Sequence, residues 1–324
     1  EKRKVSKCEM ADGDISIAWG NKGDYLYVAE SGKENMARGL YRYNIETGGR
    51  ENLISSKFGG LGIFRVYSIP NKNKLLLLEG EDWTHIEVFV LDLDDLERQQ
   101  VTSLIYPLFS AAVFEGSFVI RDPINNGLIS IDYETGKQTE VLGPQSGMLF
   151  APKRAGDNGI SFISGELYNI EIVDSATEQL ITSENVDYFP LVYKGTYYFA
   201  SRRSGKDQIW KLHNGIMSQI TNIRFSTLIL SYDARQKGDD EFIAVSTSQG
   251  IITYKNGKEL SSLCDTKKGA THGTFNAEVT KLMYALPAEE TYQLFECDLA
   301  SGEEIQLTTQ GALVGFYAEE DIYF

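Results

Sequence analysis

The side chains best suited to chemistry are few and scattered along this chain of 324 residues. The three histidines are His85, His213 and His272, and none has the spacing to another histidine or to a cysteine that a metal site needs. The acidic stretches 92–97 and 239–241 lack the spacing of a calcium-binding loop. We therefore expect solvated turns at these stretches, and we expect no metal, no cofactor and no catalytic group.

Hydrolase and phosphate-binding signatures are also missing from the sequence. No Gly-x-Ser-x-Gly elbow occurs, and the serines fall in polar turns. The glycine-rich stretch 58–64, FGGLGIF, is not followed by Lys-Ser or Lys-Thr, so it predicts a connection rather than a phosphate loop. These observations favour a binding module over an enzyme.

Composition and charge exclude several classes of protein. Hydrophobic residues make up 42% of the chain and charged residues 24%, as in soluble globular proteins. The net charge of −15 at pH 7 would repel a phosphate backbone, so direct binding of nucleic acid is not expected. No apolar stretch is long enough to span a bilayer. The basic start EKRK, without an initiating Met, suggests a mature or excised segment whose tail is solvated.

The cysteines leave two possibilities open. Cys8, Cys264 and Cys297 are odd in number and far apart in the sequence. One disulfide with a free thiol fits an exported protein, and three buried thiols fit equally well.

A hairpin pattern recurs about every 40 residues. The stretch 40–55, LYRYNIETGGRENLIS, aligns with 128–143 and 294–309. Each copy has an alternating strand, an Asn or Asp at its fifth position, a Thr-Gly or Ser-Gly turn and a second strand. The looser copies, two of them with Asn-Gly turns, are 88–103, 167–182, 209–221 and 251–263.

A further strand pair precedes each hairpin, as at 15–30 and 190–202. Four strands in each repeat of about 40 residues are typical of a β-propeller blade. We therefore predict an all-β fold, a single β-propeller domain over 1–324 built of four-stranded antiparallel blades. The complete blades are expected at about 14–56, 65–105, 107–143, 147–183, 187–222, 226–264 and 271–309.

The two chain ends predict one more blade. The stretch 311–324 resembles the inner two strands of a blade, and 3–10 resembles an outer strand. We expect eight blades, with the ring closed by the N- and C-terminal strands, because an open ring would leave two blade faces exposed. Seven blades are the alternative, with one strand pair as an insertion.

Propeller geometry places a ligand site where the loops lead into the innermost strands around the central channel. The side chains expected there are basic and aromatic, in contrast to the acidic chain, and could bind an anionic or peptidic ligand. The stretch 201–210, SRRSGKDQIW, is interpreted as an ordinary turn in which Arg202 or Arg203 could also contact a ligand. The predicted ligand-binding residues are Arg65, Tyr106, Tyr188, Arg224, Lys267 and His272, with Phe64, Gln145 and Lys268 nearby.

The stretch 198–222 resembles the repeat of TolB-type propellers. In that repeat a strand ends in Ser, followed by an Arg-x-Gly turn, an Ile-Trp pair and a strand that ends in Leu-Thr. The matching residues here are Ser201, Arg203, Gly205, Ile209, Trp210, Ile220 and Thr221. The family's Trp-Ser-Pro-Asp-Gly turn is degraded to WGNKGD at 19–24. Propellers of this type include envelope scaffolds, peptidase domains, polysaccharide lyases and extracytoplasmic domains of CadC-like transcriptional regulators.

The resemblance implies a non-catalytic binding or sensing propeller, in the periplasm or elsewhere outside the cytoplasm, within a signalling or regulatory protein. Its partner would be a protein, a peptide or a small anionic ligand at the axial channel. It would bind no nucleic acid, and it would reach a membrane only through an anchor outside this chain. The alternatives are a secreted carbohydrate-active enzyme of the lyase type and a TolB-like envelope scaffold.

Overall fold

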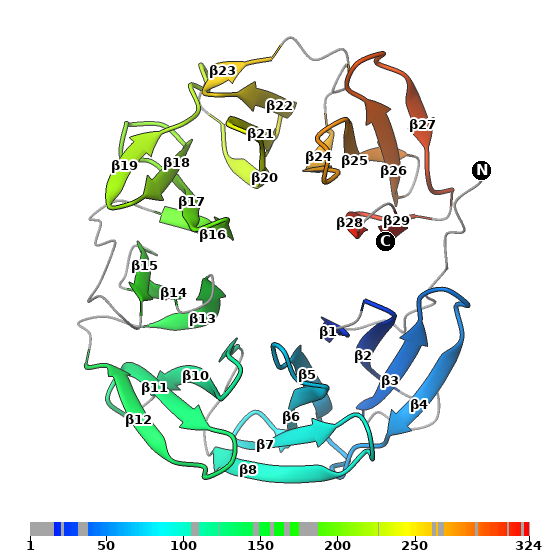
Figure 1. Cartoon of the computed structure of the whole chain (residues 1–324), viewed down its shortest axis with the longest axis vertical. Helices are drawn as coiled ribbons and strands as arrows, with labels where there is room; N and C mark the ends of the chain where they lie inside the picture. Colours follow the sequence, from blue (N-terminus) through cyan, green and yellow to red (C-terminus); the bar gives the residue numbers. More distant parts are fainter. Residues whose placement is uncertain are drawn as a thin grey trace. The chain divides into compact units, whose positions relative to one another are not determined.

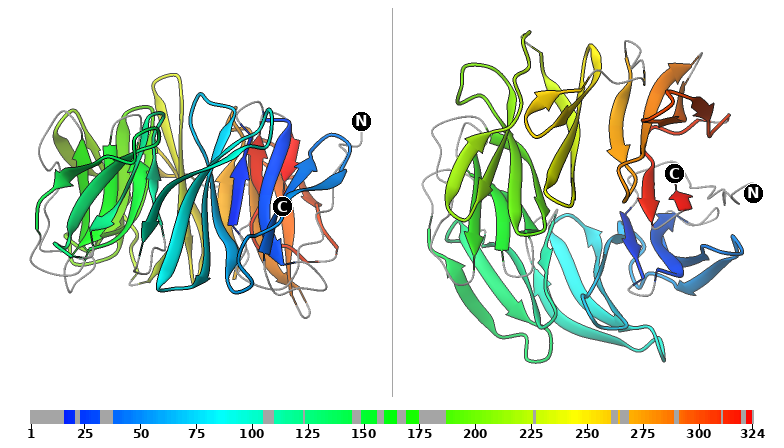
Figure 2. Two further views of the ribbon diagram at one scale, coloured as in Figure 1. Left: turned by 90° about the horizontal axis from the view of Figure 1, so that it is seen from below. Right: turned by 45° about the horizontal axis from the view of Figure 1, so that its top comes forward.

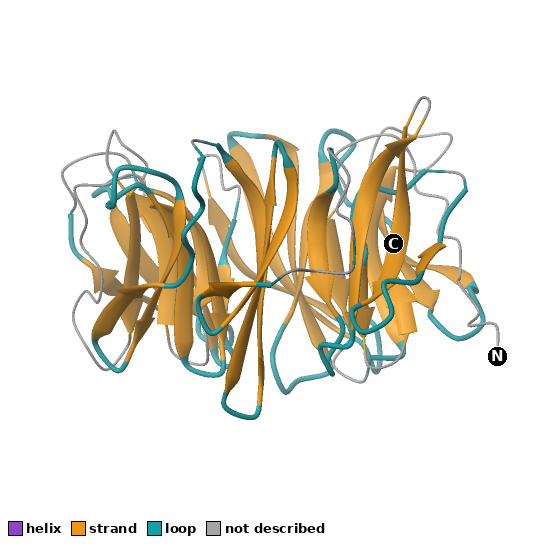
Figure 3. Cartoon of the chain, turned by 90° about the horizontal axis from the view of Figure 1, so that it is seen from above, coloured by secondary structure: helices purple, strands orange, loops and turns teal. Residues whose placement is uncertain are grey.

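The regular elements among the described residues of this computed structural model are all β-strands (Figure 3). The chain divides into two compact units. We call residues 6–166 with 171–179 the N-terminal unit and the remainder the C-terminal unit, and each is described by itself. No helix in the described ranges is long and apolar enough to cross a bilayer. The structure describes residues 16–20, 23–31, 38–104, 110–122, 124–144, 149–155, 159–164, 169–174, 187–225, 227–260, 264, 269–288, 291–309, 311–318 and 321–323.

The N-terminal unit contains three complete four-stranded antiparallel sheets among its described residues, each with its strands in sequence order (Figures 1 and 2). The first sheet comprises β1 (Ser16–Trp19), β2 (Tyr25–Ser31), β3 (Arg38–Asn44) and β4 (Arg50–Ile54). The second comprises β5 (Gly62–Ser68), β6 (Lys74–Asp82), β7 (His85–Asp92) and β8 (Arg98–Leu104). The third comprises β9 (Ala112–Val113), β10 (Ser117–Asp122), β11 (Gly127–Asp132) and β12 (Gln138–Leu142). A three-stranded sheet follows, with β13 (Phe150–Ala155), β14 (Gly159–Ser164) and β15 (Asn169–Asp174).

The C-terminal unit repeats this arrangement with three more complete sheets (Figure 1). The first has β16 (Asp187–Tyr193), β17 (Thr196–Ser201), β18 (Gln208–His213) and β19 (Ile216–Gln219). The second has β20 (Ile229–Lys237), β21 (Asp240–Thr247), β22 (Gly250–Lys255) and β23 (Lys258–Glu259). The third has β24 (Thr271–Phe275), β25 (Lys281–Ala288), β26 (Thr291–Asp298) and β27 (Glu304–Gln306). The last sheet has β28 (Phe316–Ala318) and β29 (Asp321–Tyr323).

The predicted hairpin turns form as the sequence indicates. The carboxylate of Asp298 accepts hydrogen bonds from the backbone N–H and the hydroxyl of Ser301, at 2.8 and 3.0 Å. Gly302 then adopts a φ of 74°, which glycine tolerates without steric cost. The same arrangement recurs at Asp132 with Thr135 and, through an amide oxygen, at Asn44. These local bonds explain why a hairpin repeat was readable in the sequence.

The fold is a β-propeller of four-stranded antiparallel blades, as predicted, but the blade count was wrong. Six blades are complete among the described residues, rather than eight or seven. Strand pairing between 150 and 174 gives three strands, and pairing between 316 and 323 gives two. The stretch 175–183, where the outer strand of the blade at 147–183 was expected, lies outside the described residues. The predicted closing strand, 3–10, lies outside the described residues.

Blades within a unit pack face to face through apolar side chains. In the C-terminal unit, Tyr198 and Ile243 share one interblade core, and Phe275 and Tyr284 share the next. Burying such faces supplies the main stabilisation, at roughly 25 cal/mol for each Å² of apolar surface. The second of these cores also holds a disulfide between Cys264 and Cys297, so one of the two cysteine alternatives is realised.

Candidate functional site

The inner strands of the C-terminal unit carry a bulge close to where they begin. We call the first strand of each blade its inner strand. In β16, Phe189 and Pro190 stand opposite a single residue of β17, because the register shifts between Tyr188 and Leu191. Corresponding shifts occur at Leu230 in β20 and after Thr271 in β24. Bulges re-aim side chains and are over-represented next to active sites.

Two of these bulges hold a residue other than glycine in the left-handed region. Phe189 has a φ of 55° and His272 a φ of 54°. Such backbone costs on the order of 1–3 kcal/mol and persists where the surroundings impose it. Here Tyr232 donates its hydroxyl hydrogen to the Phe189 carbonyl, at 2.5 Å. The backbone N–H of Gly273 donates to Ser246 Oγ of the preceding blade, at 3.0 Å.

The same strand starts also hold buried polar atoms that lack a hydrogen-bond partner. Among the residues that the structure describes, these include Asp187 Oδ1, Ser231 Oγ and His272 Nδ1. Others lie on outer strands, for example Thr253 Oγ1. Buried polar groups are nearly always bonded, so unpaired ones call for a reason such as a ligand.

Bulges and unpaired polar atoms thus occur on β16, β20 and β24, and strained backbone accompanies them on β16 and β24. The strand β20 contacts both β16 and β24 (Figure 1). We call this place the inner-strand site. Its residues are Asp187, Tyr188, Phe189, Leu230, Ser231 and His272.

The two titratable side chains of the site that could exchange a proton have pKa values shifted in opposite directions. Burial lowers the pKa of His272, so its imidazole is neutral at pH 7 and can accept a proton. Burial, with the Asp207 carboxylate nearby, raises the pKa of the Tyr188 hydroxyl, which therefore stays protonated. A base and an acid whose pKa values are shifted apart in this way are typical of proton-transfer sites.

The turn 201–210 joins β17 to β18, as predicted, and its two arginines are both paired. Arg203 Nη2 lies 2.8 Å from Asp187 Oδ2, and both side chains are largely buried. Arg202 donates to both carboxylate oxygens of Asp207, at 2.8 and 3.2 Å. The first pair holds the turn against the start of β16, and the second closes the turn on itself.

Of the predicted ligand-binding residues, the structure places Tyr188 and His272 in the site. Arg224 is exposed in the segment between β19 and β20, and its backbone carbonyl accepts a hydrogen bond from Lys206 at 2.8 Å. Arg65 belongs to the N-terminal unit, where it bonds the carbonyl of the buried Phe64, at the bulge of β5. Tyr106, Gln145, Lys267 and Lys268 lie outside the described residues.

The sequence analysis did not identify Asp187, Phe189, Leu230 or Ser231. A signal was available at two of the bulges. Pro190 and Gly273 stand inside strands, where proline and glycine commonly mark a bulge. At Gly273 a Cβ atom would lie only 2.9 Å from Ile251 Cδ1, which shows why this position carries no side chain.

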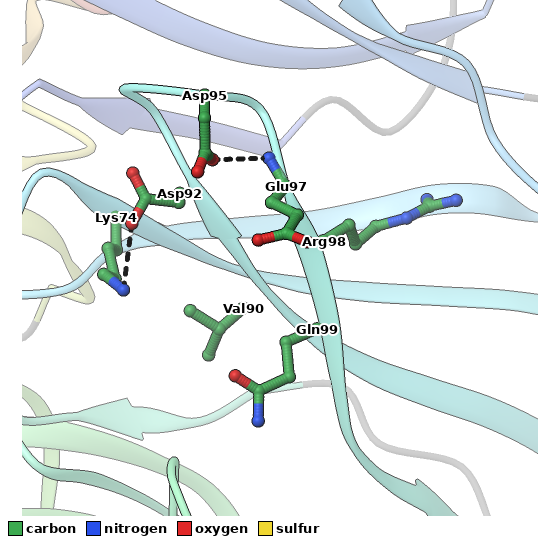
Figure 4. Close-up of a pocket in the computed structure, with 7 residues that line it drawn as sticks. All are labelled: Lys74, Val90, Asp92, Asp95, Glu97, Arg98 and Gln99. Carbon is green, nitrogen blue, oxygen red and sulfur yellow. Dashed lines mark hydrogen bonds and ion pairs between the residues drawn. The ribbon is translucent and has the colours of Figure 1, made fainter.

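The acidic stretch 92–97 borders a surface groove of about 400 Å³ in the N-terminal unit (Figure 4). The Asp92 carboxylate accepts the backbone N–H of Asp94 at 3.0 Å and lies 2.9 Å from Lys74 Nζ. Asp95 likewise accepts the backbone N–H of Glu97. These carboxylates cap their own turn, so the predicted turn forms.

Comparison with known proteins identifies the fold but no family. No family model and no curated protein matches the chain. An oligogalacturonate lyase from Vibrio parahaemolyticus is 13% identical with a TM-score of 0.59, over 93% of this chain and 97% of that chain. An oligogalacturonate lyase in complex with manganese is 12% identical with a TM-score of 0.57, over 88% and 91%. A prolyl endopeptidase structure is 13% identical with a TM-score of 0.64, over 91% of this chain but 49% of that chain.

These comparisons contradict the prediction that the chain is not an enzyme, because the three solved structures named above, which share its fold, are enzymes by name. They show no link to TolB or to CadC-like regulators. The chain spans about half the length of the prolyl endopeptidase. One of the lyases holds manganese, but the described part of this chain has no cluster of three or more His, Cys, Asp or Glu residues that fits a metal ion.

Proposed function

We propose that this chain is a carbohydrate-active propeller enzyme of the lyase type. Its substrate would be a uronate-containing oligosaccharide, which it would cleave by β-elimination at the inner-strand site. The likeness to the lyase from Vibrio parahaemolyticus supports this proposal, because it extends over nearly all of both chains. The proposal narrows the predicted anionic or peptidic ligand to a sugar.

The chemistry uses the acid and the base of the site. His272 Nδ1 removes the proton from C5 of a uronate. The C4–C5 double bond forms as the C4–O bond breaks, and the Tyr188 hydroxyl gives its proton to the leaving oxygen. The net change is a proton moved from carbon to oxygen, with no water consumed. Exchange with solvent then restores both side chains.

The observation that carries the proposal is the state of His272. Its Nδ1 atom is buried and unpaired, its backbone is strained, and its pKa is lowered by burial. A histidine that served only the core would be expected to have both ring nitrogens bonded. A base that must accept a proton from a substrate needs one nitrogen free.

The test is His272→Gln, assayed by the ultraviolet absorbance of the unsaturated uronate product. We expect kcat to fall by at least roughly 100-fold with the fold intact, since general acid–base groups contribute about 10²–10⁴. His213→Gln is the matched control, because His213 lies on β18 and bonds Thr196 at 2.8 Å. Unchanged turnover in the His272 variant, or no cleavage of any uronate oligosaccharide by the unmodified protein, would refute the proposal.

We also propose that the protein works outside the cytoplasm, as the resemblance implied. The disulfide between Cys264 and Cys297 supports this, because disulfides persist mainly in oxidising compartments. Alkylation of the protein drawn from its native cell, followed by mass spectrometry, tests it. Two alkylated thiols at Cys264 and Cys297 without prior reduction would contradict this location.

A further inference from the structure

We propose that the inner-strand site takes its uronate as a neutral ester rather than as a free carboxylate. This inference rests on the proposed lyase function and adds the substrate class. Three features carry it: the apolar side chains around the site, the pairing of its arginines, and the neutral state of its acid and base.

Large apolar side chains are exposed around the inner-strand site. The bulge residues Phe189 and Leu230 are 47% and 40% exposed. Phe225 and Leu228, in the segment that leads into β20, are 40% and 53% exposed. Such residues are ordinary singly, but grouped around a site they indicate an apolar ligand surface. A methyl ester and the C–H face of a sugar suit this surface, whereas a hydrated carboxylate would lose solvation there.

The arginines closest to the site are already neutralised. Arg203 pairs with Asp187, and Arg202 pairs with Asp207 through two hydrogen bonds. A substrate carboxylate that bound either of these two arginines would have to displace a buried carboxylate. The unpaired Asp187 Oδ1 would also repel it, since like charges in contact cost several kcal/mol.

The net charge of the whole chain also disfavours a substrate with free carboxylates. At pH 7 the net charge is −15, which disfavours the approach of a polyanion. Arg224 is a described cation that could favour a free carboxylate, because its side chain is exposed and no ion pair to it occurs within the described residues. The experiment therefore includes a variant of Arg224.

The elimination itself is easier from an ester. An ester withdraws electrons from C5 more strongly than a carboxylate does, so the C5 proton is more acidic. A neutral imidazole can then remove that proton without a cation to stabilise the intermediate. The ester bond stays intact, and the balance of atoms is unchanged from the elimination described above.

The experiment compares oligogalacturonides of one length in two forms, methyl-esterified and enzymatically de-esterified. We expect kcat/KM to be at least roughly tenfold higher for the ester and nearly independent of salt. A preference for the de-esterified form, or a rate on the ester that falls steeply with salt, overturns the inference and leaves the lyase function standing. Cleavage of neither form by the unmodified protein removes the proposed function as well.

Two exposed positions give a matched pair of variants. Leu228→Lys places a cation beside the site and should shift the preference toward the de-esterified form by roughly tenfold. Ile216→Lys, at a position 71% exposed on β19, should leave the preference unchanged. Arg224→Gln should also leave it unchanged. If Arg224→Gln instead removes the cleavage of a preferred de-esterified substrate, the inference is wrong.

Discussion

Removal of the disulfide should lower the stability of the C-terminal unit by an amount that follows from its loop. Cys264 and Cys297 are 33 residues apart in the sequence. The chain-entropy relation for a loop of that length gives about 4 kcal/mol, through the lost constraint on the unfolded chain. Both cysteines are buried in one interblade core, so we replace both with alanine, which leaves no hydroxyl without a partner there.

The assay is chemical denaturation followed by tryptophan fluorescence. Trp210, on β18, reports on the C-terminal unit once Trp19 and Trp83 are replaced by phenylalanine. The double alanine variant should lose about 4 kcal/mol of unfolding free energy. Adding a reductant should not lower the unfolding free energy of this variant any further. A loss below about 1 kcal/mol would show that this entropic reasoning is wrong for the loop.

Three further predictions concern the site and its scaffold. Tyr188→Phe should lower kcat by roughly 100-fold while thermal stability changes little, which steady-state kinetics and melting curves would test. The backbone N–H and the hydroxyl of Ser301 hold the pKa of Asp298 below its usual range, so its contribution to stability is complete above about pH 4 and is lost as the pH falls through the folded value. Asp298→Asn should therefore flatten the acid limb of unfolding free energy against pH, and an unaltered limb would contradict this. Gly127→Ala should destabilise the protein by about 1–3 kcal/mol in denaturant titrations, because its Cβ would lie 2.3 Å from the Leu142 carbonyl oxygen.

The site was only partly predictable. Tyr188 and His272 were predicted from their position at the start of inner strands, which the repeat places reliably. Asp187 and Ser231 were not, because their unpaired oxygen atoms result from bulged register and burial between neighbouring blades. The expected basic channel stays a prediction, because Lys267 and Lys268 lie outside the described residues.

The sequence by itself determined the hairpins and, through their spacing, the propeller fold. Those hairpins depend on contacts within a few residues, such as Asp298 with Ser301 and Gly302. Only the tertiary structure decided the number of complete blades, the pairing of Cys264 with Cys297, and the bulges that strain Phe189 and His272. The blade count and the disulfide depend on groups far apart in the chain, whose meeting no local pattern encodes. At the bulges Pro190 and Gly273 were a local signal, but the contacts that hold Phe189 and His272 come from neighbouring strands.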